Sequence, residues 1–118
     1  MKSYTDIEQS KRLAEILPID SADMCYPYDR HLDKLYGDIP YVMGYKRFNE
    51  DTDFPCWSLA ALLSILPNPT LTQYKDNKWN IAIFDEDNHF KQECFAQEPI
   101  DACYEMVVRL HLNKEDKQ

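Results

Sequence analysis

The hydrophobic and polar positions at the start of the chain predict an amphipathic helix over residues 5–17. Thr5 is the expected N-cap, because Glu8 three positions later completes a T-x-x-E capping box. Pro18 then ends the helix, since proline cannot continue the helical hydrogen bonds. The apolar residues on the expected inner face are Ile7, Leu13, Ala14, Ile16 and Leu17.

Two later stretches also show helical spacing. The first covers residues 57–66, with Ser58 as its expected N-cap. The second covers residues 99–112 and opens at Pro99, which suits the first position of a helix, while the polar residues 113–118 form a tail that is expected to fray. The apolar stripes are Leu59, Leu62, Leu63 and Leu66 in the former and Ile100, Cys103, Tyr104, Val107, Leu110 and His111 in the latter.

Between these two helices, alternation of apolar and polar residues predicts a three-stranded antiparallel meander. Its strands cover residues 71–75, 78–85 and 89–95. Short polar turns separate them. In the middle strand one face carries Trp79, Ile81 and Ile83, and the other carries Asn80, Ala82 and Phe84. We expect the face with the tryptophan to cover the core.

Residues 19–54 show no regular period, and we interpret them as a long ordered loop. Five of the eight tyrosines of the chain lie in this segment, among prolines and glycines. Alternation over residues 41–47 favours one short strand within it.

Together these elements predict an α+β fold in a single domain over residues 1–118. A three-stranded antiparallel meander, with the short strand as a fourth, packs against two or three helices. The C-terminal two-thirds has the order αβββα, which is also the element order of double-stranded RNA-binding domains. That analogy is one of topology alone, because a fold does not define a function.

Composition and charge narrow the range of partners. The net charge of -8 repels a phosphate backbone, so nucleic acid is disfavoured as a partner. No apolar run approaches the roughly 20 residues that span a bilayer, so we expect no membrane partner and a cytoplasmic location. The four cysteines include no C-x-x-C pair, and we expect reduced, mostly buried thiols.

Few features of the sequence indicate catalysis or metal binding. The sequence has no G-x-S-x-G, P-loop, H-E-x-x-H or G-x-G-x-x-G, so we predict no enzyme, no catalytic residue and no cofactor. A zinc set could be drawn from Cys56, His89, Cys94 and Cys103, but structural zinc sites use closely spaced ligand pairs. The acidic turn at residues 85–87 lacks the ligand spacing of a calcium loop. We therefore predict no metal site.

The tyrosine-rich segment supplies the candidate binding surface. Tyrosine and arginine are enriched at interface hot spots, and the same mixture can stack nucleic-acid bases. The alternative is that these rings only fasten the segment onto the helices. The candidate residues are Tyr26, Tyr28, Arg30, Tyr36, Tyr41, Tyr45, Lys46 and Arg47.

Three sequence blocks are distinctive together: EQSKRLAEILPIDSADM at residues 8–24, PCWSLAALLSILP at residues 55–67 and EPIDACYEMVVRL at residues 98–110. In these blocks the chain resembles a family of small proteins from phages, prophages and other mobile elements of gut bacteria. That family shares an S-A-D-M-like block, a W-S-L-x-x-L-L-x-x-L-P helix and a D-A-C-x-E-M final helix. The resemblance covers most of the chain and implies a genetic setting, with no activity and no catalytic residue to transfer.

Three hypotheses of function follow. The first is a non-enzymatic accessory protein of a phage or mobile element that binds an unknown protein partner or forms a homo-oligomer, through the loop aromatics and the exposed sheet edge. The second is a nucleic-acid-associated protein that uses the local Tyr/Arg/Lys patch. The third is a small enzyme with dispersed site residues, which a pocket joining cysteine, histidine and carboxylate side chains would favour.

Overall fold

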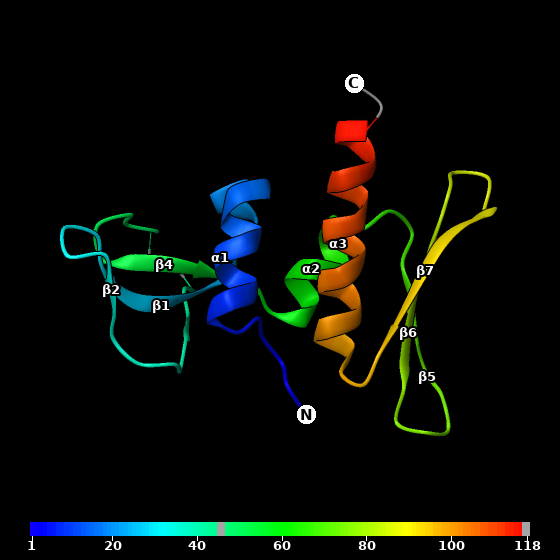
Figure 1. The fold of residues 1–118 in the computed structure, drawn as a ribbon, viewed down its shortest axis with the longest axis horizontal. Coiled ribbons are helices and arrows are strands. Elements are labelled where there is room, and N and C mark those ends of the chain that lie inside the picture. The colour runs from blue at the N-terminus through cyan, green and yellow to red at the C-terminus, as the bar shows by residue number, and fades with distance from the viewer. Residues whose placement is uncertain (45–46, 117–118) are drawn as a thin grey trace.

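The computed structural model describes the backbone of residues 1–44 and 47–116, and the side chains of these residues up to residue 114. It confirms the α+β class, with helices lying between two antiparallel sheets (Figure 1). The elements in chain order are α1 (Ile7–Ile16), the 3₁₀ helix η1 (Ile19–Ser21), β1 (Met24–Asp29), β2 (Lys34–Leu35), β3 (Tyr41–Val42), β4 (Asp53–Cys56), α2 (Leu59–Ile65), β5 (Thr70–Gln73), β6 (Trp79–Phe84), β7 (Phe90–Ala96) and α3 (Pro99–Asp116).

Helix α1 has a different cap from the one predicted. Its N-cap is Asp6, whose carboxylate accepts a hydrogen bond from the backbone N–H of Gln9 at 2.8 Å, while the Gln9 side chain accepts one from the Asp6 N–H at 3.1 Å. Thr5 is instead fully buried, and its backbone N–H donates to the carbonyl of Trp57 at 2.9 Å. The predicted Thr5 cap is wrong because this residue pairs with a segment far along the chain.

The predicted loop over residues 19–54 is also wrong, because the segment forms η1 and a small antiparallel sheet. Strand β1 connects this N-terminal sheet, because it pairs with each of the other three strands, β2, β3 and β4. The short strand expected over residues 41–47 is present as β3, which ends at Val42, and Tyr45 and Lys46 lie outside the described residues. Pro27 and Pro55 lie within strands here, which hides the strand pattern in the sequence.

The buried residue Trp57 connects the N-terminal sheet to helix α2. Its indole N–H donates to the Ser21 hydroxyl at 3.0 Å, and its ring is fully buried. Ser58 is the N-cap of α2, as predicted, and accepts a hydrogen bond from the N–H of Ala61. The helix therefore begins at Leu59, two residues later than predicted. The predicted leucine stripe packs in the core.

The C-terminal sheet confirms the predicted meander, with strand order β5-β6-β7 and antiparallel pairing. The strand ends differ from the prediction by one or two residues. Both turns hold an asparagine with positive φ, Asn77 at 57° and Asn88 at 63°, a conformation that asparagine tolerates better than most residues. Ile81 and Ile83 are buried and Trp79 is half-buried, so the predicted core face is confirmed.

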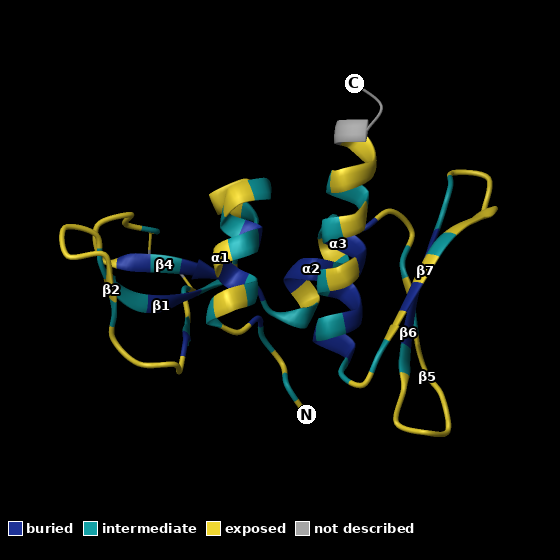
Figure 2. Ribbon diagram, in the orientation of Figure 1, coloured by how far each residue is buried: buried dark blue, intermediate teal, exposed yellow. Residues whose placement is uncertain are grey.

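Helix α3 lies between the C-terminal sheet and the other two helices (Figure 1). Because neighbours cover it on more than one side, its buried residues include the predicted Ile100, Cys103 and Val107 and also Ala102 and Met106. In the C-terminal half, buried residues gather where α2, α3 and the middle of this sheet meet, and the two hairpin ends of the sheet are exposed (Figure 2). In the N-terminal sheet, most of β4 and part of β1 are also buried. The helix continues to Asp116, so the predicted helix end at residue 112 and polar tail from residue 113 are wrong.

Candidate interaction surface

Tyr26, the first of the predicted binding residues, is part of the interior. It is 1% exposed, and its hydroxyl donates to the carbonyl of Thr5 at 2.7 Å. Burial is the main reason that the pKa of Tyr26 is raised. In this fold Tyr26 fastens β1 to the N-terminal segment, and it cannot contribute to a contact surface.

Tyr28 and Tyr41 also have structural partners in the N-terminal sheet. Tyr28 packs edge to face on Phe54, with 5.2 Å between ring centroids, and donates to the Asp33 carboxylate at 2.6 Å. That hydrogen bond is the main cause of the raised pKa of Tyr28. The hydroxyl of Tyr41, which is half-buried, donates to the buried carboxylate of Asp53. These rings hold neighbouring segments together.

The charge of Arg30 is already matched by two acids. Its guanidinium lies 2.7 Å from a Glu50 carboxylate oxygen and 3.6 Å from one of Asp51. All three side chains are exposed, so these ion pairs add little stability, but they reduce the positive potential that a phosphate would meet. The remaining candidates are Tyr36 and Arg47, which are exposed, and Tyr45 and Lys46, which lie outside the described residues.

A different exposed surface lies on the side of the C-terminal sheet that faces away from α3. No helix or strand of the described residues covers this side (Figure 1). The register of the sheet places Thr70, Ala82 and Glu93 in one row and Thr72, Asn80 and Phe95 in the next. We name this surface the outer face, and its members are Thr70, Thr72, Tyr74, Asn80, Ala82, Phe84, Phe90, Glu93 and Phe95.

Two aromatic pairs occupy opposite ends of the outer face. The ring centroids of Tyr74 and Phe95 are 5.7 Å apart, and those of Phe84 and Phe90 are 6.2 Å apart. Tyr74, Phe90 and Phe95 are each at least half exposed, at 50%, 55% and 52%. Between the pairs lie small or polar side chains, of which Asn80 and Ala82 in the middle strand are buried, so the apolar character of this face is concentrated at its two ends.

The sequence pattern places Phe84 on the face away from the core but does not connect it with the aromatic residues of the neighbouring strands. The reason is a change of register between Ile83 and Phe84, where β6 and β7 lose simple alternation. Phe90 and Phe95 are five residues apart, an odd spacing that predicts opposite faces, yet each pairs with a residue of the outer face. Only the irregular strand pairing beside the β6–β7 turn would have indicated that both rings lie on the outer face.

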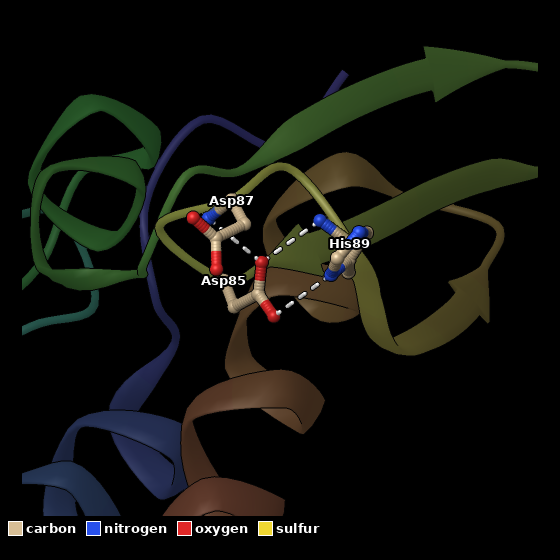
Figure 3. A group of neighbouring side chains, drawn as sticks. All are labelled: Asp85, Asp87 and His89. Atoms are coloured by element: carbon tan, nitrogen blue, oxygen red, sulfur yellow. Dashed lines mark hydrogen bonds and ion pairs between the residues drawn. The ribbon is translucent and has the colours of Figure 1, made fainter.

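The turn between β6 and β7 brings together Asp85, Asp87 and His89 (Figure 3). One carboxylate oxygen of Asp85 accepts hydrogen bonds from the backbone N–H of Asp87 at 2.9 Å and of His89 at 2.8 Å. The other oxygen lies 3.6 Å from His89 Nδ1 and 3.6 Å from the Lys91 ammonium. The bond from His89 is the main cause of the lowered pKa of Asp85.

This arrangement fits a hairpin turn better than a metal centre. Both oxygens of Asp85 are engaged, and the Lys91 ammonium beside them would repel a cation. Among the described residues, the groupings that could hold a metal include none of the cysteines weighed for zinc. We therefore assign no metal to the turn.

The cysteines lie in the interior, as predicted. All four are buried thiols outside any disulfide. Burial is the main reason that the pKa of Cys56 and of Cys94 is raised, and it raises the pKa of Cys103 to about 12. Thiols of this kind are poor nucleophiles at neutral pH.

The two I-L-P sequences at the ends of α1 and α2 line one cavity of about 130 Å³. The side chains from these ends are Ile16, Leu17, Ile65 and Leu66, and α3 closes the cavity with Val107, Leu110, His111 and Lys114. The volume is below the roughly 300 to 1,000 Å³ of typical ligand pockets. Larger hollows of about 440, 410 and 380 Å³ also contain no cysteine among their described lining residues.

Because comparison with known proteins assigns the chain to no family, only the fold defines its class. The chain is an α+β protein with an aromatic sheet face that no helix or strand of the described residues covers. No family model matches it, and neither the curated proteins nor the solved structures contain a significant match. Among the described residues, no helix combines the length and apolar character needed to cross a membrane.

Proposed function

We propose that this protein is a non-enzymatic binding protein that contacts a protein partner through the outer face. The observation that carries the proposal is the two aromatic pairs at opposite ends of this face, which no described element covers. Aromatic residues are enriched at protein interfaces. The sheet below is held by α3, so the rings are presented on a rigid support.

The biological setting is proposed on separate grounds. The resemblance of the three sequence blocks to phage and mobile-element proteins supports an accessory role in such an element. Four buried thiols outside any disulfide support a cytoplasmic location, where cysteines stay reduced.

The two alternatives have less support from individual residues. For nucleic-acid binding by the Tyr/Arg/Lys patch, Arg30 is paired with acids and Tyr26 is buried. For a small enzyme, the cavities described above do not join cysteine, histidine and carboxylate groups.

Site-specific photocrosslinking in the cells that encode the protein tests the proposal. A benzophenone amino acid replaces Phe90 or Phe95 on the outer face, and replaces Leu32, which is 68% exposed in the β1–β2 connection, as a control. We expect a light-dependent adduct with a protein from the outer face and none from position 32. Equal adducts from all three positions, or none from the outer face, would refute the proposal. An adduct that nuclease removes would favour the nucleic-acid alternative.

A further inference from the structure

We infer that the partner of the outer face is a second copy of this chain, packed face to face with the strands of the two copies running in opposite directions. The inference rests on the proposed function and names its partner. The Tyr74–Phe95 end of one copy then lies over the Phe84–Phe90 end of the other. A two-fold contact of this kind requires a surface that complements itself.

The charges at the two ends of the outer face have this self-complementary pattern. The β5–β6 turn carries Lys75 and Lys78 with Asp76, and in the described part of the chain no ion pair uses either lysine. The β6–β7 turn carries three acids at residues 85–87, which Lys91 only partly offsets. The β5–β6 turn itself is therefore net positive and the β6–β7 turn net negative.

These charges also decide the direction of packing. When the strands of the two copies run in opposite directions, each lysine-bearing turn meets an acidic turn, and this contact forms twice. When they run in the same direction, each turn meets its own copy and like charges face each other. Complementary charge selects orientation and register in interfaces of this kind.

The charge of Glu93 disfavours this antiparallel packing of the two copies. This residue lies in the middle of β7, and the two-fold axis that exchanges the ends of the sheet places β7 over β7 of the other copy. Each Glu93 carboxylate then faces its counterpart, although the Asn80 amide donates a hydrogen bond to it at 3.2 Å. Like charges in an interface weaken it, so removal of this charge should strengthen the dimer.

The area of the outer face indicates a weak dimer. Strands of four, six and seven residues, about 4.8 Å apart and at about 3.3 Å per residue, give a footprint of roughly 270 Å². Stable interfaces bury about 800 Å² on each partner, so this contact belongs to the small, transient class. We expect weak association, with a dissociation constant on the order of 100 μM, and hence an equilibrium between monomer and dimer.

Sedimentation velocity of the full chain from about 1 to about 500 μM tests this expectation. The average mass should rise from monomer towards dimer. Phe95→Ser should abolish the rise, whereas Leu32→Ser, which removes a still more exposed apolar side chain elsewhere, should leave it unchanged. Glu93→Gln should lower the dissociation constant by about tenfold, and this substitution remains informative where Phe95→Ser impairs folding.

A charge exchange tests the direction of packing. Each of the variants K75E/K78E and E86K/D87K should raise its own dissociation constant by about tenfold or more, and an equimolar mixture of the two should restore dimers. The matched control is K11E/K34E, which makes the same charge change away from the outer face and should dimerise like the unmodified chain. Dimers that form independently of these turn charges would refute the antiparallel arrangement.

The outcomes separate the two proposals. A chain that stays monomeric at the highest concentration refutes the self-association, and if the Phe95 crosslink then joins a different protein, the binding function stands. A crosslinked product of twice the mass of the chain supports both. A monomeric chain with no crosslink from the outer face refutes both.

Discussion

Replacement of Thr5 by valine gives the sharpest test of the link between the N-terminal segment and the rest of the fold. The Thr5 hydroxyl oxygen accepts a hydrogen bond from the backbone N–H of Trp57 at 3.1 Å and shares one with the Ser10 hydroxyl at 2.8 Å. Thr5 and Ser10 are both fully buried. Valine has nearly the same shape, so Thr5→Val removes these hydrogen bonds without leaving a cavity.

The expected cost follows from the groups left without partners. A buried polar group that loses its hydrogen bond destabilises a protein by about 1 to 3 kcal/mol. The Trp57 N–H loses its acceptor, while Ser10 keeps a longer contact of 3.4 Å with the Thr5 carbonyl, so its share is at the low end. We expect a total loss of about 2 to 4 kcal/mol, a large part of the roughly 5 to 15 kcal/mol that stabilises a typical domain.

Urea unfolding followed by circular dichroism measures this loss, with Asp6→Ala as the comparison. Loss of the Asp6 cap should cost about 1 kcal/mol, less than Thr5→Val. Thr5→Ser keeps the hydroxyl and serves as the control, with an expected cost of about 1 kcal/mol for the lost methyl group. A Thr5→Val protein within about 0.5 kcal/mol of the unmodified chain, or more stable than Asp6→Ala, would contradict the reasoning.

Two further predictions concern thiol reactivity and acid stability. In the native protein at pH 8 the four buried thiols should react slowly with Ellman's reagent, and all four should react after unfolding; rapid reaction of any native thiol would contradict their burial. The pKa of Asp85 is lowered from its usual value of 3.8, so this carboxylate stabilises the fold above that value and the contribution is lost as the pH falls below it. Asp85→Asn should therefore reduce the fall in Tm between about pH 4 and about pH 2, and equal losses in both proteins would show that the turn carboxylate does not contribute.

The C-terminal part of the fold could be predicted because its signals are local. Ser58 caps α2 through a residue three positions away, and the turns of the meander hold asparagines next to the strands that they connect. The alternation around Ile81 and Ile83 is long enough to separate two faces. Each of these features depends on neighbours within a few residues, and sequence patterns record such neighbours well.

The N-terminal sheet could not be predicted because its partners are far apart and its strands are short. β2 and β3 have two residues each, too few for an alternation to be recognised. β1 contains Pro27 and pairs with β4 about 30 residues later. Thr5 shows the same problem, since its capping pattern is local but its actual partner is Trp57. Tertiary pairing overrides a local preference here.

The candidate binding residues could not be predicted from the sequence for a similar reason. A tyrosine count cannot distinguish a ring such as Tyr26, whose hydroxyl bonds a buried carbonyl, from the exposed ring of Tyr36. The outer face depends on a register change between β6 and β7, which only pairing of the strands reveals. Exposure and register are properties of the assembled sheet, so the candidate residues of the outer face emerged only from the structure.

The attachment of residues 2–17 to distant parts of the chain bears on the order in which the molecule assembles. The Lys2 ammonium binds Asp101 at 2.8 Å and Thr5 pairs with Trp57, whereas each sheet is built within one continuous stretch. Contacts between distant residues form late, because closing a long loop costs conformational entropy before the contact compensates for it. We therefore expect α1 to dock last and to leave first. Its departure would open the Thr5–Trp57 junction while both sheets persist.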